Sequence, residues 1–171
     1  PLRGGAVARE GFRLTIAAEL ALLRFQLFSR EAAAGEQAAA VLGHALPSVG
    51  EVLTCEHYRI AGCAPGHWLL IAGRGLEAGL AERLQGEVAG LAATTPVTGG
   101  LVALRLAGGR CREVLARGTT LDPRQLRPGH CASTRFAGVQ ALLVAEPEAI
   151  LLLACASVGD YLRDWCHAVS C

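Results

Sequence analysis

Residues 115–138, LARGTTLDPRQLRPGHCASTRFAG, carry the signals for the end of a helix, two turns and the start of a strand. Gly118 is a typical residue after a helix, because glycine adopts the left-handed conformation without strain. The two prolines indicate turns, and the segment from Cys131 onward indicates a strand. The stretch therefore predicts a helix-to-strand joint. It also contains the adjacent pair His130 and Cys131, which comes closer to a catalytic pair than anything else in the chain.

Two strands and a helix are expected after the joint. VQALLVA at 139–145 and AILLLAC at 149–155 indicate buried strands, joined at Glu146-Pro147-Glu148. The last helix is predicted to have Ser157 at its cap, because Asp160 three residues later completes a capping-box pattern. The side chains expected to face inward are Val158, Tyr161, Leu162, Trp165 and Val169.

The elements before the joint follow a similar plan. LALLRFQLF at 20–28 alternates like a half-buried strand, and Ser29 can cap the helix that follows it. The segment 58–72 predicts two strands around a turn at Pro65, and LVALRL at 101–106 predicts another strand. Two more helices are expected, one with Leu76, Leu80, Leu84, Val88 and Leu91 on its apolar face, and one at 109–117 with Cys111, Val114 and Leu115 inward.

These elements predict an α+β fold, a mainly antiparallel sheet with helices in two strand-helix halves. We expect one domain over residues 20–171. Residues 1–19 show no obvious core, so we expect an amino-terminal arm that is loosely ordered or docked on a partner.

The composition excludes some classes of partner. Hydrophobic residues make up 52 % of the chain before its 21 glycines are added, and only 18 % of residues are charged. This composition favours a chain that buries a face against other subunits. The sixteen basic and fifteen acidic residues are interspersed, which argues against nucleic acid as a partner. No apolar run is long enough to span a membrane, and no signal-peptide segment occurs, so we expect a cytoplasmic protein.

The cysteines and histidines suggest few chemical sites. Seven cysteines at irregular spacing favour reduced thiols over disulfides. His130 and Cys131 are neighbours at the start of a strand, so their side chains should point to opposite faces and cannot form a thiolate-imidazole pair. A buried thiol beside a surface histidine is the simpler interpretation, although a remote partner for either remains open.

Two other Cys/His groups are candidate metal sites. Cys55, His57, Cys63 and His67 are residue types that zinc accepts, but their spacing matches no common zinc module. Cys166, His167 and Cys171 follow no ligand spacing either. We therefore expect no metal in this chain.

Two glycine-rich segments precede helices, Gly73-Arg74-Gly75 and Gly108-Gly109. Backbone N–H groups at such positions can bind an anion. Neither segment has the spacing of a dinucleotide-binding or Walker motif, so steric requirements explain the glycines better. We expect no cofactor-binding and no catalytic residues in the chain.

Three motifs are more specific than these patterns. They are LRLAGGRCREVLARGTTL at 104–121, PGHCASTR at 128–135 and DYLRDW at 160–165. Following WLLIAG at 68–73, they resemble the gamma subunit of heterotetrameric sarcosine oxidase. That family is similar in turn to the folate-binding domain of the glycine-cleavage T-protein, an aminomethyltransferase, which also implies an α+β fold.

The resemblance implies a structural role without catalysis. It implies alpha, beta and delta subunits as partners, and it places FAD, FMN, NAD, tetrahydrofolate and zinc in those subunits. The complex it implies demethylates sarcosine or a related N-methyl amino acid oxidatively, as an oxidase or a dehydrogenase. T-proteins carry G-Y-T-G-E-x-G-F-E-L at a hairpin where this chain has AEPEAILLL at 145–153. Folate binding is therefore not expected here. The alternative is a freestanding folate-binding aminomethyltransferase-like domain.

Overall fold

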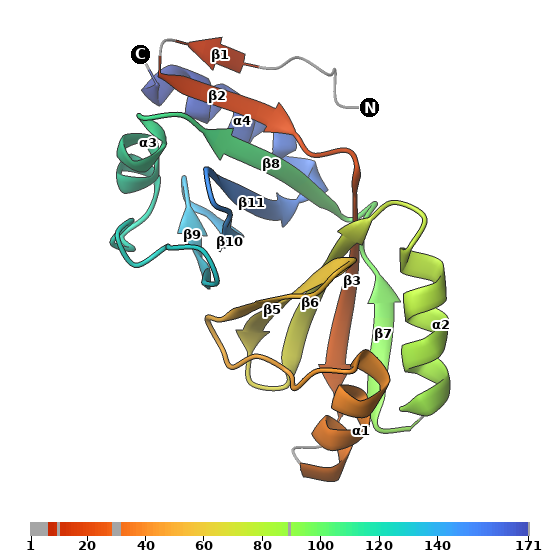
Figure 1. Ribbon diagram of the computed structural model, residues 1–171. Helices are drawn as coiled ribbons and strands as arrows, with labels where there is room; N and C mark the ends of the chain where they lie inside the picture. Colours follow the sequence, from red (N-terminus) through yellow and green to blue (C-terminus); the bar gives the residue numbers. More distant parts are fainter. Residues whose placement is uncertain (1–6, 10, 29–31, 89, 171) are drawn as a thin grey trace. The chain divides into compact units, whose positions relative to one another are not determined.

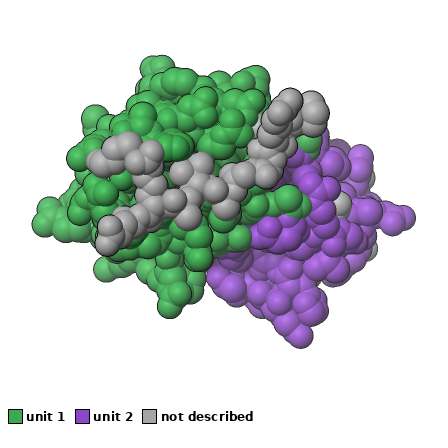
Figure 2. Space-filling model, turned by 90° about the horizontal axis from the view of Figure 1, so that it is seen from above, with its two compact units in different colours: residues 1–18, 99–171 green, residues 19–98 purple. Residues whose placement is uncertain are grey.

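The computed structural model describes residues 7–9, 11–28, 32–88 and 90–170. The chain forms two compact units. Unit 1 comprises residues 1–18 and 99–171, and unit 2 comprises residues 19–98. Figure 2 colours the two units. Within the described residues, no helix has the length and apolar character needed to cross a bilayer.

Unit 1 contains a six-stranded sheet in which every neighbouring pair is antiparallel. In spatial order the strands are β1 (Val7–Arg9), β2 (Phe12–Ile16), β8 (Leu101–Ala107), β11 (Ala149–Cys155), β10 (Val139–Ala145) and β9 (Cys131–Phe136). Two helices belong to the same unit, α3 (Cys111–Gly118) and α4 (Gly159–Val169), and a 3₁₀ turn at Ala156–Val158 precedes α4 (Figure 1).

The core of unit 1 lies between one face of this sheet and the two helices. Strands contribute alternate residues to that face, such as Leu104 and Leu106 of β8, because successive side chains point to opposite sides. Val114 and Leu115 of α3 and Leu162 of α4 complete the same cluster. The predicted strands at 131–136, 139–145 and 149–155 and the inward residues of α3 are confirmed.

Unit 2 contains a five-stranded antiparallel sheet and two helices. The strand order is β4 (Val52–Thr54), β5 (Tyr58–Ala64), β6 (His67–Gly73), β3 (Leu20–Leu27) and β7 (Ala92–Pro96), and the helices are α1 (Ala32–Leu42) and α2 (Glu77–Glu87). Leu23 and Phe25 of β3 pack with Leu80 and Leu84 of α2, as the sequence pattern predicts. The α+β class is confirmed, with two antiparallel sheets in place of one.

The expected amino-terminal arm is wrong where the structure describes it. β1 and β2 form a hairpin, and β2 pairs with β8 from Leu106 to Leu14 and from Leu104 to Ile16. Phe12 and Leu14 are buried in the core of unit 1. The chain start therefore belongs to the same unit as the carboxyl-terminal half, because its apolar residues fit the free edge of β8.

Smaller differences concern the ends of helices and short strands. Ser157 lies in the 3₁₀ turn, and α4 begins at Gly159 without a side-chain cap, so the predicted capping box is wrong. Tyr161, expected to face inward, is 49 % exposed. Leu76 precedes α2 and is 48 % exposed, although Leu80, Leu84 and Val88 are buried as predicted. The Ser29 cap lies outside the described residues. The sequence pattern missed β4 and β7.

Candidate functional site

The helix-to-strand joint, residues 119–130, is a series of turns tied by backbone hydrogen bonds. Thr119 is extended and ends α3. The N–H of Gln125 donates to the carbonyl of Asp122, and the N–H of His130 donates to that of Arg127. Leu126 is 3 % exposed and anchors the joint in the core of unit 1. The proline turns predicted from the sequence therefore form a fixed structure.

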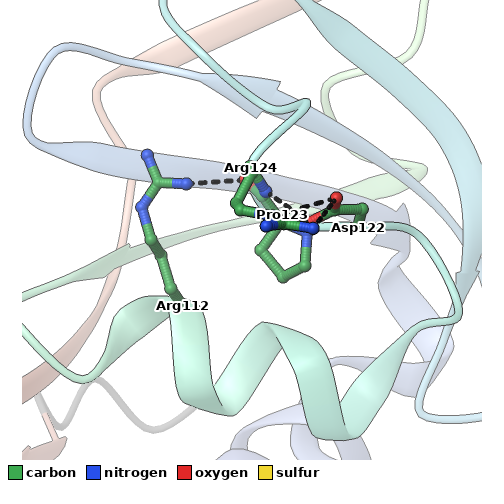
Figure 3. Close-up of polar contacts among 4 residues, drawn as sticks. All are labelled: Arg112, Asp122, Pro123 and Arg124. Carbon is green, nitrogen blue, oxygen red and sulfur yellow. Dashed lines mark hydrogen bonds and ion pairs between the residues drawn. The ribbon is translucent and has the colours of Figure 1, made fainter.

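An arginine of α3 and an Asp-Arg pair hold the outside of the joint (Figure 3). Arg112 Nη1 donates to the carbonyl of Pro123 at 2.7 Å. Asp122 accepts from both the backbone N–H and the guanidinium of Arg124. These hydrogen bonds from Arg124, with a smaller effect of the Arg112 charge, lower the pKa of Asp122. Asp122 is thus a carboxylate that stabilises the turn.

The two ends of the joint meet through close packing. A Cβ on Gly118 would lie 2.4 Å from the ring of Phe136, so only glycine fits there without a shift. The hydroxyls of Thr119 and Thr134 are 3.0 Å apart. Phe136 also meets Trp165 of α4 edge to face at a centroid distance of 5.1 Å. The three family motifs of the sequence therefore converge on one packed region.

The β9–β10 hairpin connects this region to α4. Ala137 and Gly138 both have positive φ, 50° and 83°, in a two-residue turn of the type that matches strand twist. The Tyr161 hydroxyl donates to the carbonyl of Ala137 at 2.8 Å. This bond gives the exposed Tyr161 a role that the helical pattern alone did not reveal.

His130 and Cys131 do not act on each other in the structure. Cys131 is 5 % exposed and begins β9. His130 is half-buried, and its Nδ1 is buried without a hydrogen-bond partner among the described residues. A general base needs a partner that orients its ring, and the pair supplies none. A nucleophile-base dyad is therefore not formed here.

The Cys and His side chains of unit 2 that were candidate metal ligands have different environments. His57 has a 68 % exposed side chain beside Glu56. The Cys63 thiol donates to the carbonyl of Ala61, and burial raises its pKa to about 11. Burial is also the main cause of the raised pKa of Cys55. Across the described part of the chain, no three His, Cys, Asp or Glu side chains come together in a way that could hold a metal ion.

The carboxyl-terminal thiols are divided between the core and the end of the chain. Cys166 is fully buried, and burial, with a smaller effect of Cys111, raises its pKa to about 12. Cys111 is buried beside it in the same core, with a pKa raised to about 11 by burial. His167 is exposed on α4, and Cys171 lies outside the described residues. The buried thiols behave as small apolar side chains.

The glycine segments serve the fold. Gly108 has φ +101°, and a Cβ on it would lie 2.4 Å from the carbonyl oxygen of Gly11. The N–H groups of Arg110 and Cys111 donate to Gly11 and Gly108 within the chain. At the other segment, the Arg74 N–H donates to the carbonyl of Glu19. Gly108 allows close approach of two backbones, whereas a Cβ on Gly73, Gly75 or Gly109 would meet nothing within 4 Å. The N–H groups of Arg74, Arg110 and Cys111 are already used within the chain.

The hairpin between β10 and β11 tests whether folate fits. Glu146 lies in the segment that corresponds to the glycine-rich motif of T-proteins. Glu146 has a 13 % exposed side chain and accepts from Arg105 Nε at 2.8 Å. Its backbone N–H bonds the carbonyl of Ala149, closing the hairpin tightly. A carboxylate held in this way stabilises the sheet, so the residues present do not fit a folate-binding role.

Arginine contacts to helix ends were missed by sequence reasoning. Arg110 and Arg117 of unit 1 donate to the carbonyls of Ser170 and Val169 at the end of α4. These carbonyls have no partner within the helix, and a guanidinium there satisfies them and complements the helix dipole. The partners are 60 and 52 residues apart in sequence, so no local pattern signals them.

An open depression in unit 2 has a volume of about 560 Å³, and its described lining residues are Gln37, Ala40, Val41 and Arg83. Arg83 Nη2 donates to the carbonyl of Val41 at 2.8 Å, and the Tyr58 hydroxyl donates to that of Leu42. Both bonds close the carboxyl end of α1. The depression therefore borders the capped end of α1, and among its described lining residues Arg83 alone is charged.

Comparison with solved structures identifies the fold. A chain in the heterotetrameric sarcosine oxidase from Corynebacterium sp. U-96, in complex with pyrrole 2-carboxylate, has a TM-score of 0.83 at 23 % identity, covering 95 % of this chain and 86 % of that one. The glycine cleavage system aminomethyltransferase T from Bartonella henselae has a TM-score of 0.65 at 15 % identity, over 95 % of this chain and 53 % of that one.

A more distant likeness is the ligand-free regulatory subunit of aspartate kinase from Thermus thermophilus, with a TM-score of 0.52 at 6 % identity over 96 % of this chain and 98 % of that one. At these identities the structural matches establish fold alone. Among curated proteins, no sequence matches the chain. The model of the sarcosine oxidase gamma subunit family matches residues 29–171, which include all three motifs of the packed region. The chain therefore belongs to the sarcosine oxidase gamma subunit family.

Proposed function

We propose that the chain is a noncatalytic, structural subunit of a heterotetrameric complex of the sarcosine oxidase type. The complex oxidatively demethylates sarcosine or a related N-methyl amino acid. The observation that carries this proposal is the family match over residues 29–171. The fold likeness to a chain of a heterotetrameric sarcosine oxidase supports the same role.

The chemistry of the candidate residues also supports a structural role. Asp122 and Glu146 hold arginines, Cys111 and Cys166 are core thiols, and His130 has no orienting partner among the described residues. These five side chains are of types that catalysis normally uses, but each is either part of the packing or lacks a catalytic partner among the described residues. The reaction then belongs to other subunits.

The partners in this proposal are the alpha, beta and delta subunits of the complex. FAD, FMN, NAD, tetrahydrofolate and zinc are bound by those subunits, and the assembly works in the cytoplasm. This chain contributes a folded surface. Because hydrophobic residues make up 52 % of it, a share of that surface is expected to be buried on assembly.

Size-exclusion chromatography tests the assignment. The chain alone is expected to self-associate or to be poorly soluble, and to co-elute as one stoichiometric peak when co-expressed with the larger subunits. Binding of the folded form should raise its melting temperature with partner concentration. A sharp monomer peak alone, with no co-elution when the alpha and beta subunits are added, contradicts the proposal.

The second candidate is a freestanding folate-binding domain of the aminomethyltransferase type, which the likeness to aminomethyltransferase T favours. A titration of the isolated chain with tetrahydrofolate separates the two. The structural proposal expects no saturable binding, because Glu146 is held by Arg105. Saturable binding that is lost in Glu146→Gln supports the folate domain.

A further inference from the structure

The charges of the chain are distributed unevenly, although the whole chain has a net charge of +1. Residues 110–127, which comprise α3 and most of the joint, contain five arginines and only two acidic residues, Glu113 and Asp122. The two segments are adjacent in space, because Arg112 of α3 bonds the carbonyl of Pro123 in the joint (Figure 3). The even interspersion expected from the sequence is therefore wrong for this region.

Four of these arginines are exposed, Arg112, Arg117, Arg124 and Arg127, and they define the α3 basic surface. The helix explains their position. Cys111, Val114 and Leu115 face the core, so Arg112 and Arg117 lie on the solvent side of the same short helix. Arg124 and Arg127 lie on the exposed outside of the joint, which Leu126 anchors from within.

The hydrogen bonds of these arginines leave most of their positive charge uncompensated. Arg112 and Arg117 each donate one N–H to a backbone carbonyl, and a carbonyl satisfies a donor without neutralising a charge. Among the described residues, Arg124 is the one of these four in an ion pair, with the carboxylate of Asp122 at 3.0 Å, and the charge of Arg112 acts on the same carboxylate. A guanidinium has five N–H donors, so Arg112 and Arg117 retain donors for another molecule.

Arg127 is the clearest case. Its backbone is fixed, since its N–H donates to the carbonyl of Gln125 and its carbonyl accepts from His130. Its side chain is exposed and forms no hydrogen bond or ion pair with any residue that the structure describes. A long charged side chain on a rigid backbone is a typical arrangement for contact with a partner, because less ordering is needed on binding.

Guanidinium groups bind carboxylates in a bidentate geometry, and complementary charge speeds association. Nucleic acid fits less well, because the rest of the chain has thirteen acidic residues against eleven arginines and would repel a polyanion. We propose that the α3 basic surface binds a carboxylate-rich surface of a partner protein. The inference rests on the proposed function, since it names the contact by which this chain joins its complex.

Charge reversal at Arg127 tests the proposal with the full chain. Arg127→Glu and Arg127→Lys are compared with Arg13→Glu, which makes the same charge change at an exposed position of β2. Equal melting temperatures establish that the variants fold. The association rate with the co-purified alpha, beta and delta subunits should fall about tenfold in Arg127→Glu, remain near wild type in Arg127→Lys, and change less than twofold in Arg13→Glu.

A second measurement tests carboxylate binding by this surface without the other subunits. Poly-L-glutamate and duplex DNA are titrated against the same variants at low salt. The proposal expects poly-L-glutamate binding that salt weakens and that Arg127→Glu reduces more than Arg13→Glu does. Tighter binding of DNA than of poly-L-glutamate, or an equal effect of the two reversals, overturns the surface assignment.

The two measurements separate the inference from the proposed function. If wild type joins the subunits and Arg127→Glu joins them at the same rate, the basic surface is wrong and the subunit role stands. If wild type does not join them, the subunit role fails, and the poly-L-glutamate titration still decides whether this surface recognises carboxylates.

Discussion

Unit 1 and unit 2 share one plan, an antiparallel sheet with two helices, but they differ in how a helix end is closed. In unit 1, Arg110, which precedes α3, and Arg117 of α3 donate to the last carbonyls of α4. In unit 2, the end of α1 is closed by Arg83 and by the neutral hydroxyl of Tyr58. The last carbonyls of a helix, which have no partner within it, are therefore capped by two positive charges in unit 1 and by one in unit 2.

The difference extends to the whole of each unit. Unit 1 has eleven arginines against seven acidic residues, and unit 2 has five against eight. All three family motifs, at 104–121, 128–135 and 160–165, fall in unit 1. The three motifs that carry the sequence resemblance therefore contain packing and capping residues of the basic unit, which also carries the surface proposed for a partner.

The largest effect is expected from adding a methyl group where backbones touch, once in each unit. Gly108→Ala would place Cβ 2.4 Å from the carbonyl oxygen of Gly11 at a positive φ, and Gly62→Ala would place it 2.1 Å from that of Ser48. Each should lower the free energy of unfolding by about 3 kcal/mol. Urea unfolding is followed at Trp165 for unit 1 and Trp68 for unit 2, in single-tryptophan backgrounds.

Gly99→Ala is the control for these variants, since a Cβ there meets nothing within 4 Å. Gly108→Ala should shift mainly the Trp165 transition, and Gly62→Ala mainly that of Trp68. Shifts no larger than that of Gly99→Ala would mean that the close approaches are not present in solution.

Alkaline pH should weaken unit 1 through its buried thiols. Burial raises the pKa of Cys166 from 9.0 to about 12 and that of Cys111 from 9.0 to about 11. The folded state therefore keeps both protons after the unfolded state has released them. The stabilisation is complete below pH 9 and is lost as the pH rises from about 9 toward 12.

This pH dependence is measured by urea unfolding between pH 8 and about 10.5, with the Trp165 signal. Cys166→Ala should reduce the fall in the free energy of unfolding over this range, because its titrating group is gone. Cys155→Ala serves as the control, since Cys155 is exposed and its hydrogen bond with Ser157 lowers its pKa. An unchanged slope in Cys166→Ala would contradict the account of this thiol.

Removing a helix-end arginine should have a moderate effect in both units. Arg117→Gln removes a bond of 2.6 Å to α4, and Arg83→Gln removes one of 2.8 Å to α1. Each should lower the free energy of unfolding by about 1 kcal/mol, because a helix carbonyl loses its charged donor. Arg13→Gln, at an exposed site on β2, is the control, and an equal loss there would indicate a general charge effect.

The smallest effect is expected at Ser157. The sequence pattern makes it a helix cap, and loss of such a cap costs about 1 kcal/mol. In the structure α4 has no side-chain cap, so Ser157→Ala should change the free energy of unfolding by less than about 0.5 kcal/mol. The Trp165 transition in urea measures the change. A loss of unfolding free energy near about 1 kcal/mol would indicate that Ser157 does cap the helix.

Sequence reasoning succeeded where local pattern and burial agree. The strands 139–145 and 149–155 are long apolar runs between turn residues, so their bounds were predictable. The inner face of α3 was predictable too, although the helix runs from Cys111 to Gly118 and not from 109 to 117. β4 and β7 have three and five residues without alternation, and their existence depends on strands supplied from elsewhere in unit 2. The same holds for β2, whose burial depends on β8.

Only those features of the candidate site that depend on residues close in sequence could be predicted. The joint, its turns and the separation of His130 from Cys131 follow from neighbouring residues. The contacts that explain Gly118, Arg110 and Tyr161 reach residues between 18 and 60 positions away, so they require the fold. Position in the fold, and not residue type, therefore distinguishes a packing glycine or a capping arginine from a ligand site.

The central claim is that this chain supplies structure, and no chemistry, to an oxidative demethylating complex. The most direct test is the turnover of sarcosine per assembled complex, at equal flavin content, with Cys131→Ser and with His130→Ala in this chain. Rates within about twofold of wild type are expected, because His130 and Cys131 form no nucleophile-base dyad with each other. A fall of about a hundredfold with assembly intact would contradict it and return a catalytic role to the joint.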